Sequence, residues 1–292
     1  MTSGSFRSSY RPARVAVLFF LVVALFFYGS LVWTGVISMT SSKLLPVYNF
    51  VGFDQYSRLW STDRWIVSLV NMVIFGVLYV VVSMALGIFL AILLDRNVRG
   101  EGVFRAIFLY PFAVSLVVTG LAWRWIFEPA QGVQAIMRGF GFESFAFDWL
   151  SDPERAIYTL VIAGVWHSVG FAMIIVLAGL RGIGSDLWKA IRVEGIPLWR
   201  GYLQIILPSL WPVVASAVVL LASDVIRAYD LVITLTKGGP GFASDLPAKF
   251  AVDHFFGRAN IGFASAASIL MMLLVVAMLV PYFWAEYRAQ KK

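Results

Sequence analysis

The sequence has no cysteine, only two histidines and few charged residues, which make up 13% of its 292 residues. The lack of cysteine excludes disulfides, thiolate metal sites and cysteine nucleophiles. A Walker A motif, a G-x-S-x-G elbow and an H-E-x-x-H zinc motif are all missing. We therefore expect no catalytic residue, no metal ligand, no bound cofactor and no ATP hydrolysis by this chain. Serine with His167 or His254 leaves an intramembrane enzyme as an open alternative.

Hydrophobic residues are abundant, at 60% of the chain, and the mean hydropathy is +0.84. A soluble domain of this composition would expose large apolar patches to water. Six apolar runs reach the roughly 20 residues that a helix needs to cross a bilayer. They occupy residues 15–37, 67–94, 104–127, 156–180, 205–226 and 261–284. The chain is predicted to be an all-α polytopic membrane protein with about six transmembrane helices.

The distribution of basic residues predicts the orientation of these helices. The N-terminal tail 1–14, the second and fourth loops and the C-terminal tail 288–292 together hold 13 Lys and Arg residues. The longer loops on the opposite side hold 8. Because Lys and Arg are enriched in cytoplasmic loops, we expect both termini to be cytoplasmic. No basic cluster with interleaved aromatic residues occurs, so nucleic acid is not an expected partner.

Residues 185–208 form a charged stretch between two apolar runs, on the predicted cytoplasmic side. Ser185 or Asp186 can cap the start of a helix, and Leu187, Ala190 and Ile191 then share one face. Gly195 is a natural end for it. The pattern predicts a helix of about two turns, followed by a turn and a return helix. A helix this short needs a partner surface to be stable; the alternative is an ordinary interfacial loop.

This stretch resembles the "EAA" loop of ABC importer permeases. Ala190, Glu194 and Gly195, followed by Ile205, Leu207 and Pro208, fall on the family pattern at its spacing. Lys189 stands where the family usually has Glu, and Ile191 where it usually has the second Ala. The resemblance implies a coupling helix held in a cleft of a cytoplasmic ATPase, with one charge of that contact inverted by Lys189. The residues implied in coupling are Asp186, Lys189, Ala190, Arg192, Glu194 and Gly195.

Other stretches resemble the carbohydrate branch of the same permeases, the maltose and glycerol-3-phosphate type. They are residues 51–56 (VGFDQY), Asn71, Phe104-Arg105 with Pro111, residues 123–127 (WRWIF) with Gly132, and Tyr229-Asp230 with Thr236 and Gly238-Gly239-Pro240. The ordered set covers roughly residues 50–285. It implies a type I transmembrane domain over residues 65–287 with its coupling loop at 181–204, after a first transmembrane helix and external loop at 15–64.

The resemblance also implies partners and a location. Expected partners are a second homologous permease, an ATPase dimer that binds ATP and Mg, an extracytoplasmic solute-binding protein and the lipid of a bacterial inner membrane. The implied function is one half of a translocation pathway for a sugar or sugar derivative. Open alternatives are a permease for another polar solute of glycerol-phosphate or polyamine type, an ion-coupled secondary transporter, or an intramembrane enzyme.

Ionisable and polar residues within the apolar runs, or near the end of one, are candidates for the solute path, because such groups rarely face lipid. Asp224, Arg227 and Asp230 follow one another at i, i+3 spacing, which predicts one shared helical face. Their alternative role is a self-neutralised group near an interface. Carboxylates and guanidinium groups bond sugar hydroxyls, and aromatic rings stack on the sugar ring. Further candidates are Asn71, Trp123, Arg124, His167 and Tyr229; Arg124 can equally be an interfacial anchor, and His167 and Asn71 buried structural residues.

Overall fold

The computed structural model describes residues 10–96 and 98–290. Within these residues the chain is helical, and its only strand-like pairing is an isolated bridge between Thr40 and Phe50. The chain divides into two compact units, one of Met1–Ser61 with Ala251–Leu270 and one of Thr62–Phe250 with Met271–Lys292. The predicted cytoplasmic tails, 1–14 and 288–292, lie in part outside the described residues.

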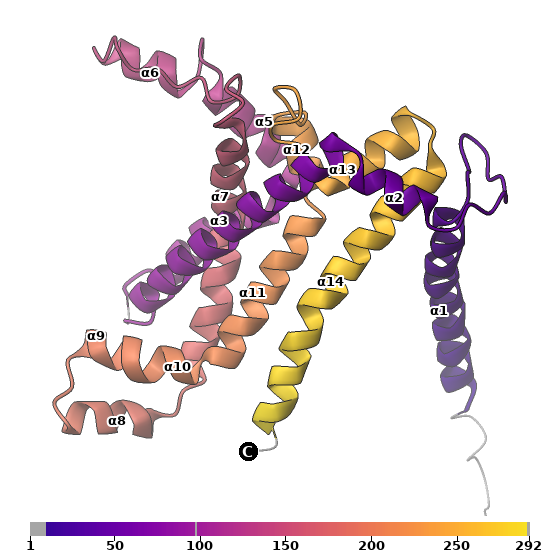
Figure 1. Cartoon of the computed structure of the whole chain (residues 1–292). Coiled ribbons are helices and arrows are strands. Elements are labelled where there is room, and N and C mark those ends of the chain that lie inside the picture. Colours follow the sequence, from indigo (N-terminus) through magenta and orange to yellow (C-terminus); the bar gives the residue numbers. More distant parts are fainter. Residues whose placement is uncertain (1–9, 97, 291–292) are drawn as a thin grey trace, which may run out of the picture. The chain divides into compact units, whose positions relative to one another are not determined.

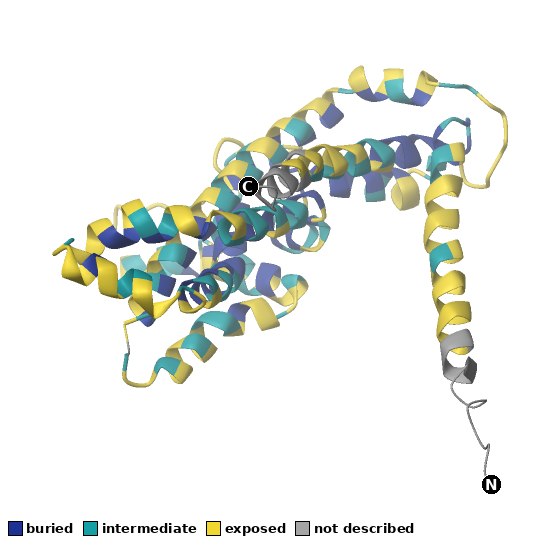
Figure 2. Ribbon diagram, turned by 90° about the horizontal axis from the view of Figure 1, so that it is seen from below, coloured by how far each residue is buried: buried dark blue, intermediate teal, exposed yellow. Residues whose placement is uncertain are grey.

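The smaller unit contains α1 (Tyr10–Ser38), α2 (Asp54–Trp60), the π-helix η2 (Asp253–Gly257) and the first part of α14 (Ile261–Gln290). Apolar side chains of α1 are exposed along most of its described length (Figure 2). A helix that is apolar on all sides and not covered by protein is typical of a helix surrounded by lipid. At the end of α1, Gln55 Nε2 donates to the carbonyl of Thr40 at 2.9 Å, and the N–H of Gly262 donates to the carbonyl of Ser42 at 2.9 Å.

The larger unit is built on two long helices that lie side by side, α3 (Asp63–Leu94) and α7 (Ala156–Arg181) (Figure 1). Their backbones meet at Gly87, where an added Cβ would lie 2.6 Å from the Cβ of Ala172. Any side chain at position 87 would therefore force the two helices apart. Buried apolar residues of α7, such as Leu160 and Met173, fill the core of this unit.

The third expected span, 104–127, is not one helix. It consists of α4 (Glu101–Ala113) and α5 (Leu116–Phe127), which meet at 97°. Val114 is extended, and the hydroxyl of Ser115 caps α5 by accepting from the N–H of Val117 at 3.3 Å. Pro111 lacks the N–H needed to continue α4 regularly. The prediction of a continuous helix was wrong, because the residues on both sides of the break are apolar and composition alone does not indicate it.

The fifth expected span, 205–226, is also broken. Its first part is a continuous helical segment made of α9 (Leu198–Arg200), the π-helix η1 (Gly201–Ile206) and α10 (Leu207–Ser209). This segment meets α11 (Trp211–Ile226) at 72°. Two prolines, Pro208 and Pro212, flank the break and remove backbone donors there. The described residues hold four unbroken helices long and apolar enough to cross a membrane, or up to six if each bent pair is one span.

Four short helices complete the described part of the chain: α6 (Val133–Gly139), α8 (Ser185–Val193), α12 (Tyr229–Leu235) and α13 (Pro247–Val252). The segment with α6 precedes α7 and α8 follows it, so these two short helices lie at opposite ends of α7 (Figure 1). The larger unit thus presents α8 at one end and the loop around α6 at the other.

Candidate functional site

The charged stretch after α7 forms the expected short helix. Helix α8 has nine residues and ends at Val193; Gly195, two residues further on, has a φ of +66°. The N–H of Ile196 donates to the carbonyl of Ile191, and that of Gly195 to the carbonyl of Arg192. This Schellman arrangement explains why glycine is needed at 195. The predicted cap at Ser185 or Asp186 was wrong: Gly184 holds the N-cap position, and no side chain bonds the helix start.

One face of α8 is packed against the return segment. Ile191 is buried, and an added Cβ on Gly201 would lie 3.1 Å from its Cγ2 atom. The ring of Trp188 meets the ring of Tyr202 edge-on, with centroids 5.2 Å apart. Ala190 is exposed, which corrects its predicted place on the packed face; Trp188 takes that place instead. The packed side of α8 therefore holds it against η1 and leaves the other side free.

The free face of α8 carries most of the residues implied in coupling. Asp186 and Lys189 form an ion pair of 2.9 Å, with 94% and 64% of their side chains exposed. Val193, at the last turn, is 87% exposed. Arg192, Glu194 and Gly195 are exposed as well. Charged groups around an exposed valine form a surface suited to a protein partner.

Two polar contacts connect the ends of the long helices α3 and α7 to η1 and α4, close to where α8 and η1 pack together. The hydroxyl of Tyr202 donates to Oδ2 of Asp95, just beyond the end of α3, at 2.8 Å. Glu101, at the start of α4, accepts from Arg181 at the end of α7 at 2.6 Å, and from Arg105 at 3.4 Å. Sequence reasoning missed both contacts, because their partners lie far apart in the chain.

A polar cavity of about 180 Å³ lies within the larger unit. Its polar lining comprises Tyr79 of α3, His167 and Ser168 of α7, and Asp224 of α11. The hydroxyl of Tyr79 donates to Oγ of Ser168 at 2.6 Å. The aromatic rings of Phe75 and Phe112 line the same space. Two predicted path residues, His167 and Asp224, are thus brought together, whereas sequence reasoning missed Tyr79 and Ser168.

His167 is buried and also contacts a neighbouring helix, since its Nδ1 lies 3.4 Å from Oγ1 of Thr119 in α5. A second cavity, of about 380 Å³, lies between α3, α11 and α14 and is lined by apolar residues alone. It offers no hydrogen-bonding groups to a polar solute. The smaller cavity is therefore the better site for such a solute.

The predicted common face of three charged residues does not exist. Asp224 and Arg227 pair at 2.9 Å, but α11 ends at Ile226 and α12 begins at Tyr229. Asp230 consequently lies in a different helix and is exposed, as Arg227 is. The i, i+3 spacing was misleading because a helix break falls between Asp224 and Asp230.

Trp123 and Arg124 do not line the cavity. The ring of Trp123 packs against those of Phe127 at 5.1 Å and Trp166 at 5.9 Å, and Arg124 beside it is half-buried. Tyr229, also half-buried, is likewise outside the cavity lining. This aromatic cluster joins α5 to α7 and accounts for Trp123 without a solute contact.

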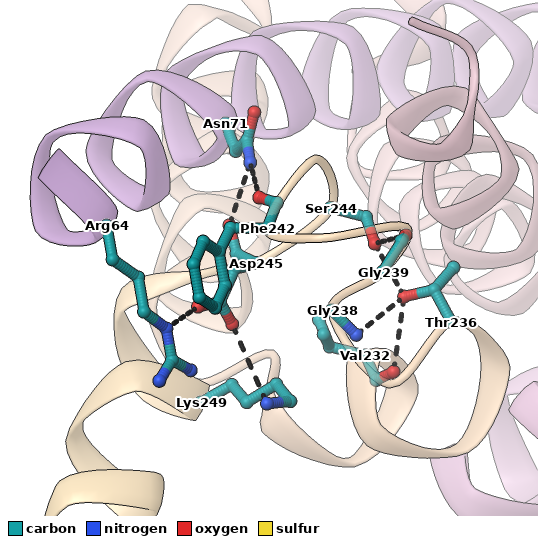
Figure 3. A network of polar contacts seen from close by, with 10 residues as sticks. All are labelled: Arg64, Asn71, Val232, Thr236, Gly238, Gly239, Phe242, Ser244, Asp245 and Lys249. Carbon is teal, nitrogen blue, oxygen red and sulfur yellow. Dashed lines mark hydrogen bonds and ion pairs between the residues drawn. The ribbon is translucent and has the colours of Figure 1, made fainter. Parts of the chain in front are cut away.

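Asn71 belongs to a buried polar network at the start of α3 (Figure 3). Its Nδ2 donates to the carbonyls of Phe242 at 3.2 Å and Asp245 at 3.1 Å. Arg64 pairs with Asp245 at 2.6 Å, and the two side chains are 9% and 0% exposed. Lys249 lies 3.9 Å from the same carboxylate. These four residues fix the loop after α12 to α3, and we call them the Arg64 network.

The loop held by the Arg64 network has its own internal bonds. Oγ1 of Thr236 accepts from the N–H of Gly238 at 3.2 Å and from Oγ of Ser244 at 2.8 Å (Figure 3). Ser244 also donates to the carbonyl of Gly239 at 2.6 Å. The stretch from Thr236 to Pro240 is thus an ordered loop, and two of its hydrogen bonds meet at the Thr236 hydroxyl.

Comparison with known proteins places the chain in a family. The sequence model of one protein family, the binding-protein-dependent transport system inner membrane component, matches residues 83–290 of this chain. The chain belongs to this family. Its members are multi-pass membrane components of transport systems rather than enzymes. The expectation of an ABC importer permease is confirmed.

Individual proteins agree with this assignment. A probable ABC transporter permease of Pyrococcus horikoshii is 34% identical over 93% of this chain and 94% of its own length. The trehalose/maltose transport system permease protein MalF of Thermococcus litoralis is 31% identical, covering 94% of each. A permease chain of a bacterial alginate ABC transporter, crystallised with an alginate pentasaccharide-bound periplasmic protein, has a TM-score of 0.82 at 19% identity and covers 96% of each chain. The predicted type I fold is confirmed.

Proposed function

We propose that this chain forms half of the membrane pathway for a sugar or sugar derivative, delivered by a solute-binding protein. The observation that carries the proposal is the polar cavity among membrane-spanning helices, with Tyr79, His167, Ser168 and Asp224 in its wall. Relatives support the solute class: one is a trehalose/maltose permease. Another was crystallised with a protein that holds an alginate pentasaccharide.

The chemistry of the cavity suits a neutral sugar. Asp224 can accept hydrogen bonds from two hydroxyls, and Ser168 and Tyr79 can both donate and accept. The rings of Phe75 and Phe112 offer flat apolar surfaces for the C–H face of a sugar. No Lys or Arg is in the cavity lining, and Arg227, outside the lining, is already paired with Asp224 at 2.9 Å, so a phosphate-bearing solute would have to compete with this carboxylate for the cation. The sugar is therefore favoured over the glycerol-phosphate alternative.

Energy for transport comes in this proposal from a cytoplasmic ATPase dimer that holds ATP and Mg. The free face of α8, with Lys189 and Val193, docks in a cleft of that ATPase, and both termini lie in the cytoplasm. Closure of the ATPase on ATP moves α8 and shifts the spans between inward-facing and outward-facing states. A second homologous permease supplies the other half of the pathway. Each state differs in its affinity for the sugar.

The experiment that tests this proposal is uptake by the complete transporter in proteoliposomes. The assembly contains this chain, the second permease, the ATPase and the cognate binding protein, and it is offered labelled trehalose, maltose, glycerol 3-phosphate and spermidine. Asp224→Asn removes a charged acceptor from the cavity, which is worth about 1.5–3 kcal/mol. We expect sugar uptake to fall by about 10-fold or more, with the amount of assembled complex unchanged.

The matched control is Asp148→Asn, which removes an exposed carboxylate of the loop after α6. Uptake should be unchanged in this variant. Uptake of glycerol 3-phosphate or spermidine, with no uptake of either sugar, would contradict the sugar assignment. Uptake without ATP would favour a secondary transporter, and equal loss of uptake and assembly in Asp224→Asn would make that residue structural.

A further inference from the structure

Helix α3 makes polar contacts with other segments at three levels along one unbroken helix of 32 residues. Near its start, Arg64 and Asn71 hold the loop after α12. Midway, Tyr79 donates to Ser168 in the wall of the cavity. Just beyond its end, Asp95 accepts from Tyr202. At a rise of about 1.5 Å per residue, roughly 24 Å of helix separates Tyr79 from Asp95.

The contact at Asp95 reaches directly to α8. Tyr202 is buried, and its hydroxyl lies 2.8 Å from the Asp95 carboxylate. A hydrogen bond to an ionised acceptor is short and strong for its kind. The ring of Tyr202 meets that of Trp188, and Ile191 packs on the neighbouring Gly201. A continuous series of contacts therefore runs from α8 through Tyr202 to α3.

The covalent route from α8 to the cavity is less direct mechanically. It passes from α7 through the turn Gly182-Ile183-Gly184, whose two glycines impose little resistance to bending. Helix α3, in contrast, is unbroken and packs on α7 without a gap at Gly87. The segment from α9 to α11, which leads from α8 to Asp224 in the cavity wall, contains the 72° bend. Rigid elements with discrete contacts transmit displacement better than flexible turns.

We propose that α3 carries the displacement of α8 to the cavity, and that the bond between Tyr202 and Asp95 is the joint through which it does so. This rests on the proposed function, in which an ATPase moves α8. Tyr202 and Asp95 are positioning residues: they touch neither sugar nor nucleotide. When α8 moves, Tyr202 pulls or pushes Asp95, and α3 shifts Tyr79 relative to the rest of the cavity wall.

The test is the number of sugar molecules transported per ATP hydrolysed, measured in proteoliposomes with the complete transporter. Tyr202→Phe removes the hydroxyl alone and keeps the ring against Trp188. We expect the transport ratio to fall at least threefold, while assembly and ATP hydrolysis persist. Asp95→Asn should lower the ratio less, because its amide oxygen still accepts from the hydroxyl. Tyr110→Phe, at an exposed tyrosine of α4, is the matched control and should leave the ratio unchanged.

The outcomes separate this inference from the proposed function. An unchanged ratio in Tyr202→Phe, with wild-type coupling intact, overturns the role of α3 and leaves α7 as the route. Parallel loss of assembly and transport in both Tyr202→Phe and Asp95→Asn makes the contact merely structural and also overturns the inference. A wild-type complex whose ATPase never responds to the loaded binding protein contradicts the proposed function itself.

Discussion

Removing the carboxylate of Asp245 should destabilise the protein strongly. Asp245 is fully buried, and its partner Arg64 is 9% exposed, so Asp245→Asn leaves a guanidinium group buried beside a neutral amide. Lys249, at 3.9 Å, loses its nearby carboxylate as well. Removing one member of a buried ion pair typically costs about 3–5 kcal/mol of unfolding free energy. We expect a loss of this size.

The assay is unfolding in mixed micelles with rising SDS, followed by tryptophan fluorescence. Trp65, one of the eleven tryptophans that give this signal, is buried, and its ring lies 5.1 Å from that of Phe250, beside the network. The matched control is Asp186→Asn, which removes the carboxylate of an exposed ion pair and should cost only a small fraction as much.

A double variant sharpens the prediction. Adding Arg64→Met to Asp245→Asn removes the stranded charge, so part of the lost stability should return, although Lys249 remains. A loss below about 1 kcal/mol in Asp245→Asn, or strict additivity in the double variant, would refute the view that the buried pair fixes this loop to α3.

Two further variants test the packing of the chain. Gly195→Leu places a side chain at a φ of +66°, which costs about 1–2 kcal/mol locally. Uptake and sugar-stimulated ATPase activity should therefore fall, while the chain still inserts into the membrane. Normal activity in this variant would exclude α8 as the coupling element. Gly87→Val forces α3 away from Ala172 and should reduce the yield of folded protein severalfold, measured by size-exclusion chromatography, whereas Gly102→Ala, at an open position in α4, should not. Equal yields would argue against the close contact.

Much of the architecture could be predicted from local patterns. Apolar runs of sufficient length indicated the long helices, because a bilayer requires about 20 apolar residues. The end of α8 followed from Gly195, whose left-handed conformation is a local property of glycine. The bends within two of the spans were not predicted, although Pro111, Pro208 and Pro212 stand close to them. Proline in a membrane helix is tolerated, so its presence alone does not place a break.

The site was predictable only in part, for a different reason. His167 and Asp224 are polar residues in apolar runs, and that contrast alone indicates them. Tyr79 does not stand out in this way, because a tyrosine among valines looks like any packing aromatic residue. The contacts of Arg64 with Asp245 and of Asp95 with Tyr202 join residues 181 and 107 positions apart. No local pattern reports such pairs.

A single cysteine at Val193 tests the central claim most directly, since the native chain has none. The side chain at 193 is 87% exposed on the free face of α8. In the assembled transporter, we expect Val193→Cys to cross-link to the ATPase subunit with a short bifunctional reagent, and to resist a membrane-impermeant maleimide added from outside intact cells. Labelling from outside, or no cross-link in a complex that contains the ATPase, would contradict the account.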